Sequence, residues 1–459
     1  MKKLYNFFIK YSDLFFLCIT ISLTIYVFYK SEIYWDGKKR EYYFIYYLIL
    51  IFLTFFSFVL FFLNNFQKKI ILFNFVLIFI ITYIAEIYIT FKGGPLTLEK
   101  LALKEKITIE EQVIKETLYF NNTGKKYDTK DTKTVYKELK SKGEKIVVKV
   151  PPITFLKKEL DIQPLSGISN SKTLSCNENG YYSIYFSDRY GFNNPDYEWD
   201  KEKIEYLLVG DSMTFGECVN RPHDIGSILR KRSEKGVLNL GYGSNGPLIY
   251  YASLREYLDL NVNKILILFF EGNDLINLNE ELENKILKNY LDDINYSQNL
   301  KLKQSKIDKI VHQEIIDEQN RFKNKITENS NLNKFNYIKF IKLFNLRYLI
   351  KNPNHNSMKE LSKILKLSND LAKNKNAKLY FIYLPEYFRY KLDYNYTNKD
   401  YKRIKKIVNK LGITFIDIHK EVFDKENNPL DLFPFGFFGH YNVEGYEKVG
   451  NAIFRLTSK

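Results

Sequence analysis

A serine follows directly on a hydrophobic run in the segment LLVGDSMTFGECV, residues 207–219. The run ends at Gly210-Asp211-Ser212, where a buried strand would turn into a helix. A serine hydroxyl becomes a nucleophile only when a base removes its proton and when hydrogen-bond donors face the oxyanion that forms. If Ser212 does chemistry, the chain must bring a histidine and backbone or amide donors to it. Otherwise this is an ordinary strand-to-helix turn that holds a serine.

One histidine stands where such a base is needed. The chain has five histidines: His223, His312, His355, His419 and His440. His440 lies in the segment FFGHYNVEGYEKVGNAI, just before the last expected helix. Its loop would return to the edge of the sheet that holds Ser212. The other four lie in or beside an insertion, at a helix start or behind a strand, where surface or core roles are expected.

From residue 204 onwards, short apolar strands alternate with helical patterns. The strand candidates are 204–209, 237–240, 265–270, 379–384 and 414–416. This alternation predicts a parallel sheet with helices on both faces, and such sheets bind ligands beyond the carboxyl ends of their strands. The first three strands end at GDS, NLGYGSNGP and EGND, so polar and glycine residues gather there. The stretch 278–350 is too long for one crossover, and its polar helical pattern predicts an insertion that caps the site.

With these residues in place, the chain resembles the SGNH, or GDSL-like, hydrolase family over about residues 200–459. Four blocks occur in the family's order: GDSMTFG with Ser212, NLGYGSNG, EGND with Asn273, and HYNVEGY with His440. The resemblance implies a flavodoxin-like α/β/α domain at 201–459, and we expect no cofactor and no metal ion. It implies that Ser212 attacks an ester carbonyl and that His440 is the general base. The implied oxyanion hole joins the backbone N–H of Ser212, a backbone N–H of the glycine block and the Asn273 amide.

Two positions depart from the family's pattern. The glycine block usually ends in glycine, but Ser244 stands there, and we place the backbone donor at Gly243. The family usually has aspartate three residues before the histidine, and this chain has Phe437. Asp431 or Asp417 could orient the imidazole instead, or a backbone carbonyl could do so in a Ser-His dyad. Without a carboxylate the imidazolium is less stabilised, so slow turnover and loss of activity both stay open.

The region upstream, residues 93–200, is expected to be a linker and a collar. Its segment PLSGISNSKTLSCNENGYYSIYFSDRYGFNNPD resembles a group of bacterial membrane-anchored SGNH proteins associated with surface polysaccharides. In relatives of that kind, such as the alginate acetylation proteins, the domain faces outward and moves or removes acyl groups on sugars. Tyr182, Tyr190, Phe192 and Asn193 could line a sugar site, or they could pack the collar against the sheet.

Residues 1–92 are expected to form a membrane domain. Apolar runs cover Leu14 to Tyr29, Tyr42 to Gln67 and Ile70 to Phe91, and about 20 apolar residues cross a bilayer. No small-residue cleavage site follows the first run, so we expect three transmembrane helices rather than a signal peptide. The flanking lysines mildly oppose export of the catalytic domain by the positive-inside rule. The resemblance nevertheless implies an extracytoplasmic, periplasmic domain on a multi-pass membrane protein.

The net charge of +16 does not indicate a nucleic-acid partner. The lysines are scattered, often beside acidic residues as in KELKSKGEK, and arginine forks for phosphate are few. No motif of a nucleic-acid-binding fold stands out. We therefore expect the membrane, and not nucleic acid, as the partner of this charge.

The three cysteines bear on location. Cys18 lies in a membrane run, whereas Cys176 and Cys218 lie in the soluble part. The latter two either remain buried thiols or, in an exported domain, pair and tie the collar to the nucleophile loop.

The resemblance thus predicts a membrane-anchored serine esterase that acts on acyl, such as acetyl, esters of a cell-surface glycan or a lipid-linked sugar. A membrane acyltransferase is a further partner that it suggests. Three alternatives stay open: an O-acyltransferase to surface polysaccharide, a catalytically weak glycan-binding scaffold, and a lipid esterase that faces the cytoplasm.

Overall fold

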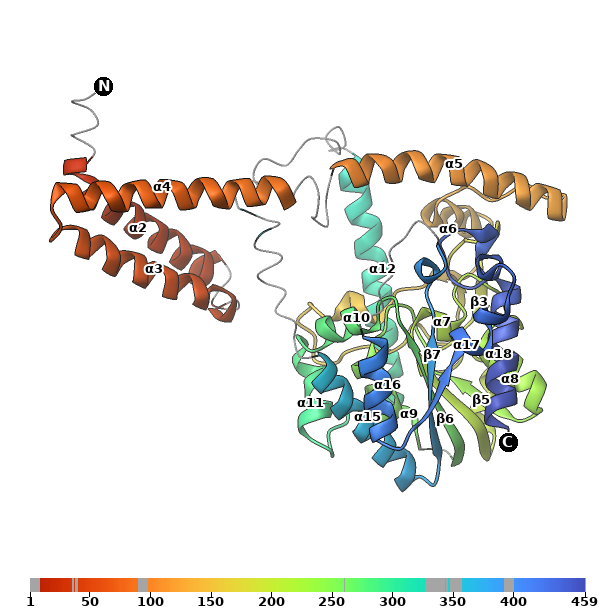
Figure 1. Cartoon of the computed structure of the whole chain (residues 1–459). Helices are drawn as coiled ribbons and strands as arrows, with labels where there is room; N and C mark the ends of the chain where they lie inside the picture. The colour runs from red at the N-terminus through yellow and green to blue at the C-terminus, as the bar shows by residue number, and fades with distance from the viewer. Residues whose placement is uncertain are drawn as a thin grey trace. The chain divides into compact units, whose positions relative to one another are not determined.

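The computed structural model describes residues 9–34, 37, 40–89, 98–259, 261–326, 343, 346, 357–391 and 400–458. The chain divides into two compact units, residues 1–103 with 335–352 and residues 104–334 with 353–459. The first unit contains the apolar helices, and the second contains an α/β body (Figure 1).

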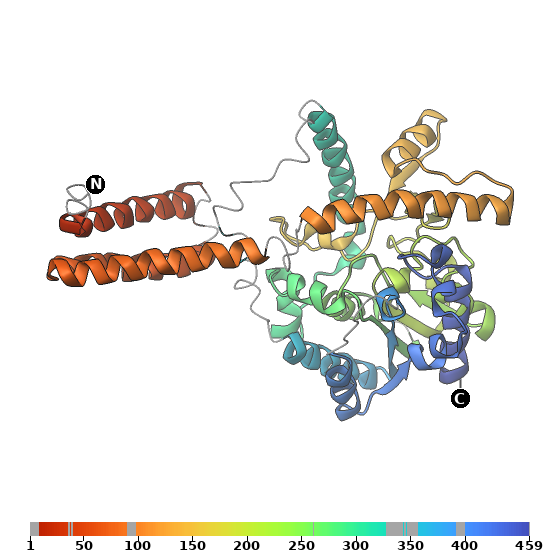
Figure 2. The same cartoon turned by 45° about the horizontal axis from the view of Figure 1, so that its top comes forward.

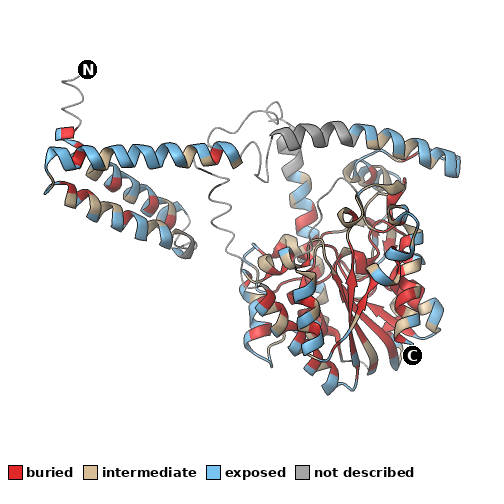
Figure 3. Cartoon of the chain, in the orientation of Figure 1, coloured by how far each residue is buried: buried red, intermediate tan, exposed pale blue. Residues whose placement is uncertain are grey.

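The first unit has three helices that are long and apolar enough to cross a membrane. They are α2 (Ser12–Phe28), which a π-helical segment continues to Tyr34, α3 (Arg40–Leu60) and α4 (Asn65–Tyr88). Most of their apolar side chains are exposed, as lipid-facing side chains would be (Figure 3). The three predicted apolar helices are confirmed.

The second apolar run is shorter than the sequence suggested. The helix α3 ends at Leu60, and Asn64 begins the next helix as its N-cap, because its side chain accepts hydrogen bonds from the backbone of Phe66 and Gln67. An apolar pattern alone does not mark such a break. The last two residues of the third predicted run lie outside the described residues.

Five parallel strands form the sheet of the second unit. They are β4 (Lys203–Gly210), β5 (Gly236–Asn239), β6 (Asn261–Phe270), β7 (Lys378–Leu384) and β8 (Thr414–Asp417). Their order is β5-β4-β6-β7-β8, which is the flavodoxin-like order, so the predicted fold class is confirmed. The chain leaves β4 for β5 on one side and then crosses to β6 on the other. The carboxyl end of β4 is therefore the switch point, where doubly wound sheets open a crevice.

Helices cover both faces of this sheet (Figures 1 and 2). One face carries α9 (Pro247–Tyr257), α15 (Ser357–Asn374) and α16 (Tyr401–Lys410); the other carries α8 (Ile225–Ser233), α17 (Ile418–Glu421) and α18 (Val443–Thr457). Along β4 the side chains alternate, because Leu207 and Val209 pack into the first core cluster while Tyr206 and Leu208 pack into the second. Both faces of the strands are therefore buried.

The described part of the predicted insertion is mostly helical, with non-helical segments such as 293–299 between its helices. It contains α10 (Asp274–Glu281), α11 (Lys285–Asp292) and α12 (Gln304–Ile326). Most of its remainder, from residue 327 onwards, lies outside the described residues.

The collar contains two helices and a small sheet. They are α5 (Leu98–Thr123), α6 (Thr132–Ser141), β1 (Ile146–Val148), β2 (Lys172–Leu174) and β3 (Ile184–Phe186). The strands lie in the order β1-β2-β3, and β2 and β3 form an antiparallel hairpin. The tip of this hairpin reaches the functional site described below.

The core predicts a large stability effect at one phenylalanine. Phe381 is fully buried. The centre of its ring lies 5.4 Å from that of Phe269 and 5.8 Å from that of Phe415, and both pairs are stacked. We expect Phe381→Ala to lower the free energy of unfolding by about 3–5 kcal/mol, measured by denaturation of the detergent-solubilised chain. Phe186→Ala is the control, since that side chain is 55% exposed. Equal effects of the two variants would contradict the described core.

Candidate functional site

Ser212 is the first residue of the short helix α7 (Ser212–Phe215), directly after β4. Asp211 caps this helix, because its carboxylate accepts the Met213 N–H at 2.9 Å, and the Ser212 hydroxyl donates to the same carboxylate at 3.3 Å. Complete burial raises the pKa of Asp211 to about 6. The Ser212 N–H stands at a helix start, where no carbonyl of the preceding turn can accept it.

The glycine block fixes the position of α7. Asn239 donates from its side-chain amide to the Thr214 carbonyl at 2.6 Å. A side chain at Gly241 would come within 2.6 Å of Thr214 and 2.8 Å of the Phe215 nitrogen. Only glycine permits this close approach, so the glycine block holds the short helix that begins at Ser212 against the end of β5.

All four predicted site residues line one cavity of about 910 Å³. Its lining includes Ser212, Gly243, Asn273 and His440, together with the collar residues Lys149, Cys176 and Glu178. Glu314 and Glu318 of α12 line it too. The predicted insertion therefore contributes to the wall of this cavity.

A glutamate of the collar holds His440. Glu178 Oε1 lies 3.0 Å from His440 Nδ1, and Glu178 Oε2 accepts the His440 backbone N–H at 2.7 Å. Gly439 allows this approach, because a side chain there would come within 2.8 Å of the carboxylate. With Nδ1 donating to Glu178, Nε2 is the ring nitrogen left to accept a proton.

The prediction that Asp431, Asp417 or a backbone carbonyl orients the His440 imidazole is therefore wrong. Asp431 accepts a hydrogen bond from the Asn428 side chain, and Asp417 accepts one from the Tyr401 hydroxyl. Neither contacts His440 among the hydrogen bonds of the described residues. A dyad completed by a backbone carbonyl is not found either, since Nδ1 faces the Glu178 carboxylate.

Phe437, at the position where the family usually has aspartate, has a different neighbour. Its ring lies 5.4 Å from the Lys115 ammonium of α5, a cation–π contact. The chain thus uses this position to pack the last loop against the collar and takes its carboxylate from the collar.

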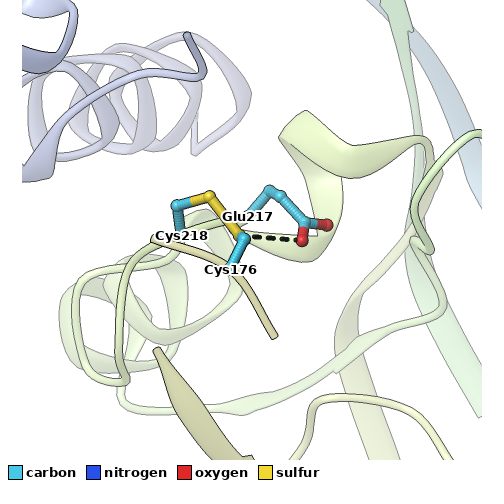
Figure 4. A group of neighbouring side chains, drawn as sticks. All are labelled: Cys176, Glu217 and Cys218. Atoms are coloured by element: carbon cyan, nitrogen blue, oxygen red, sulfur yellow. Dashed lines mark hydrogen bonds between the residues drawn. A yellow bond between two sulfur atoms is a disulfide. The ribbon is translucent and has the colours of Figure 1, made fainter. Parts of the chain in front are cut away.

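Three contacts dock the Glu178 loop onto the nucleophile loop. Cys176 and Cys218 form a disulfide, with their Cα atoms 5.0 Å apart (Figure 4). The Asn179 amide donates to the Cys218 carbonyl at 3.0 Å, and the Ser175 hydroxyl donates to Glu217 at 2.8 Å. Of the two alternatives for these cysteines, the structure shows the pair.

Glu178 and His440 set each other's charge. Burial alone would lower the pKa of His440, but the Glu178 carboxylate outweighs it and raises this pKa to about 9. Burial likewise acts to raise the pKa of Glu178, but His440 outweighs it and holds that pKa below its ordinary value. At neutral pH the site therefore contains an imidazolium–carboxylate pair.

Two groups at the cavity can donate to an oxyanion beside Ser212. The Gly243 N–H makes no hydrogen bond to any other described residue. Asn273 is the N-cap residue of α10 and lines the same cavity, and its side-chain amide N–H groups donate to no other described residue. The cavity therefore brings together a serine hydroxyl, an imidazole with a carboxylate partner, and two hydrogen-bond donors.

A buried ion pair lies next to Gly243. The Lys149 ammonium pairs with Glu217, and both side chains are at least nine-tenths buried. The ammonium also lies 4.5 Å from the centre of the Phe215 ring. This pair joins the collar to the loop that follows the nucleophile. Removing one partner of a buried ion pair lowers the stability of the folded protein by several kcal/mol, because the other charge stays buried without a partner. Lys149 and Glu217 are therefore structural supports of the site.

The aromatic residues that could have lined a sugar site pack the collar instead. Phe192 and Asn193 are buried, and the Asn193 amide donates to the Phe215 carbonyl. Tyr190 packs on Trp199, and the Tyr182 hydroxyl donates to the Lys130 carbonyl. None of the four lines the cavity at Ser212.

Two groups of side chains bring potential metal ligands together. They are Cys176 with Glu217 and Cys218, and Glu178 with Cys218 and His440. Each includes a disulfide sulfur, which is not a thiolate and does not ligate metal in this state. Glu217 Oε1 lies 3.0 Å from Cys176 Sγ (Figure 4).

Sequence reasoning missed Glu178. One signal pointed to it: Glu178 stands two residues after Cys176, in the segment CNENG, and pairing of Cys176 with Cys218 would bring that segment to the nucleophile. A carboxylate beside a half-cystine of a collar was the group to test.

No protein-family model and no curated protein matches the chain. Solved structures resemble it weakly. A candidate lipolytic protein of the G-D-S-L family from Desulfitobacterium hafniense DCB-2 is 14% identical, with a TM-score of 0.30 over 56% of this chain and 99% of its own. A member of the lipolytic G-D-S-L family from Veillonella parvula DSM 2008 is 11% identical, with a TM-score of 0.31 over the same two shares. A psychrotrophic esterase from Pseudoalteromonas sp. is 10% identical, with a TM-score of 0.26 over 56% of this chain and 96% of its own.

The Glu178 contact predicts the titration of His440. NMR of the five histidine rings should show one ring with a pKa near 9, absent from His440→Ala. In Glu178→Gln the opposing charge is gone while burial still favours the neutral ring, so this pKa should fall to its ordinary value of 6.5 or below. Glu138→Gln, which removes a carboxylate paired with Lys130 on the surface, is the control. A pKa that stays near 9 in Glu178→Gln would contradict the pair.

The disulfide should hold Glu178 in place. Peptide mapping without reductant should recover Cys176 linked to Cys218. In a Cys176→Ser, Cys218→Ser variant the hairpin loses its covalent link, and we expect the pKa of His440 to move down from 9. Cys18→Ser, in the apolar helix α2, should leave the pKa of His440 unchanged. Free thiols at both positions in protein from an oxidising compartment would rule out the link.

Proposed function

We propose that the chain is a serine ester hydrolase in which Ser212 is the nucleophile, His440 the base and Glu178 the group that orients it. One observation carries this proposal: His440, held at Nδ1 by Glu178, opens into the same cavity as Ser212, Gly243 and Asn273. Serine chemistry needs these groups together.

The residues have the following roles. His440 Nε2 takes the proton of Ser212 as the hydroxyl oxygen attacks the ester carbonyl. The backbone N–H groups of Ser212 and Gly243 and the amide of Asn273 donate to the oxyanion. The imidazolium then protonates the leaving alcohol, and water releases the acyl group from Ser212 by the reverse sequence. Glu178 stabilises the imidazolium at both stages.

The proposed substrate is an acyl ester, such as an acetyl ester, of a cell-surface glycan or lipid-linked sugar. The apolar helices α2, α3 and α4 would keep the enzyme at the membrane. The disulfide between Cys176 and Cys218 favours an oxidising, extracytoplasmic location for the α/β unit, because such bonds are rare in reducing compartments. Glu178 also favours catalysis over a scaffold role, since that alternative arose from the missing aspartate.

Hydrolysis of p-nitrophenyl acetate by the full chain in detergent tests the proposal. We expect Ser212→Ala and His440→Ala to lower kcat by at least about 10³-fold, and a fluorophosphonate probe to label the wild type but not Ser212→Ala. Ser141→Ala and His312→Ala, both at exposed positions, are the controls. Labelling that survives in Ser212→Ala, or equal rates in all variants, would overturn the assignment.

The raised pKa of His440 predicts that this activity is lost towards acidic pH. Only the neutral imidazole accepts a proton, so kcat/KM should fall as the pH drops below about 9. Glu178→Gln should move this limb to lower pH and reduce the maximal rate by about 10²–10⁴-fold, because orientation and imidazolium stabilisation are lost. If the acid side of the pH profile stays in place in Glu178→Gln, Glu178 does not set the pKa of the catalytic base and this role of Glu178 is wrong.

A further inference from the structure

A second cavity, of about 410 Å³, adjoins the first. It lies between α6 and α12, with Tyr136 on one helix and Ile315 and Gln319 on the other. Thr132, Val148 and Glu318 line both cavities. The cleft at Ser212 therefore continues into a side lobe that the proposed esterase chemistry does not use.

We propose that this lobe is a subsite for an uncharged sugar unit next to the unit that carries the ester. The inference rests on the proposed function and extends it from the reacting bond to the substrate beyond it. Three features of the lining support it: an aromatic ring fixed in place, hydrogen-bonding groups that pair with no other described residue, and a charge balance that disfavours anions.

The aromatic ring is Tyr136. It is half-buried and packs against Val135, Ile146 and Leu174, so it enters the lobe at little further cost in side-chain entropy. The C–H groups on one face of a sugar ring carry slight positive charge and pack against the negative face of an aromatic ring. Tyr136 is the only aromatic residue that lines this lobe within the described part of the chain.

The polar groups suit hydroxyls. Glu318 and Gln319 pair with no other described residue, so the carboxylate can accept hydrogen bonds while the amide can both donate and accept. Asp131 is already engaged, because its side chain accepts the Thr134 N–H at 2.7 Å and caps α6. This cap occupies a donor that a phosphate or carboxylate ligand would otherwise use.

The charges of the lining argue against an anionic occupant. Two carboxylates, Asp131 and Glu318, face one lysine, Lys133, which disfavours an acidic sugar or a phosphate. The lining combines the apolar surfaces of Tyr136, Val148 and Ile315 with hydrogen-bonding groups of the other five lining residues, Asp131, Thr132, Lys133, Glu318 and Gln319. An uncharged, hydroxyl-rich ring uses both kinds of surface, whereas an acyl chain uses only the apolar one, and the octanoate ester below distinguishes the two.

The test measures binding to the full-length Ser212→Ala chain in detergent, so that it does not depend on turnover. The probes are unacetylated cellotriose, mannotriose and N-acetylchitotriose, their methyl monosaccharides, and an oligogalacturonate trimer. We expect at least one uncharged trimer to bind about tenfold or more tightly than its monosaccharide, and the acidic trimer to gain nothing. Tyr136→Ala and Gln319→Ala should each abolish this gain.

Tyr197→Ala is the matched control, since that tyrosine is 61% exposed on the short helix Asp196–Asp200 and does not line the cleft. A His440 pKa near 9 in each variant shows that the site is still folded. Trimers that bind no better than monosaccharides, or a gain that survives Tyr136→Ala, would overturn the subsite.

A second readout separates an acyl pocket from a sugar subsite. If Tyr136→Ala lowers kcat/KM for p-nitrophenyl octanoate more than for the acetate, the lobe holds acyl chains and the proposal is wrong. If the wild type binds a trimer in this way but hydrolyses no ester, the subsite stands and the esterase assignment fails.

Discussion

The contact between Glu178 and His440 is the interaction on which this site depends. Burial by itself disfavours the charged form of His440, but the Glu178 carboxylate, with two hydrogen bonds to this residue, keeps the imidazolium favourable. The carboxylate is itself costly to bury without its partner. Each member is therefore stable there because of the other, and a serine reaction needs an oriented imidazole whose charged form is stabilised.

Much of the surrounding structure serves to bring these two groups together. Glu178 lies on a hairpin of the collar, whereas His440 lies in the last loop before α18. The bond between Cys176 and Cys218 and the ion pair between Lys149 and Glu217 tie the collar to the loop after α7. The edge of the α/β sheet provides Ser212, Gly243 and Asn273, and the collar provides the Glu178 carboxylate. Neither part makes the site alone.

Because a disulfide joins the two parts, the geometry of the site depends on whether the compartment is oxidising or reducing. In a reducing compartment the cysteine link opens, and Glu178 then depends on the hydrogen bonds, the ion pair of Lys149 with Glu217 and the packed side chains of the collar. In an oxidising compartment the link is permanent. Because the disulfide holds the hairpin that carries Glu178, an oxidising compartment favours the formation of the carboxylate–histidine pair.

The sequence by itself determined the features that local patterns of residues encode, namely the helices, the strands and the positions of the strand ends. Short apolar runs separated by helices predicted the five strands and their parallel sheet, and the strand ends placed Ser212, Gly243 and Asn273 at one edge. Three long apolar runs predicted the three helices of the first unit, although the end of α3 needed the Asn64 cap to be seen. These features depend on neighbours within a few residues or on a fixed rule of chain topology.

Only the tertiary structure decided which carboxylate orients His440. Asp431 and Asp417 were nearer in sequence, and nothing local distinguished them from Glu178, which is 262 residues away. The same holds for the lobe between α6 and α12, whose walls come from segments far apart in the chain. Such contacts depend on how the collar docks on the sheet, and the free energy of that docking is spread over a disulfide, an ion pair and many packed side chains. No motif of a single segment records it.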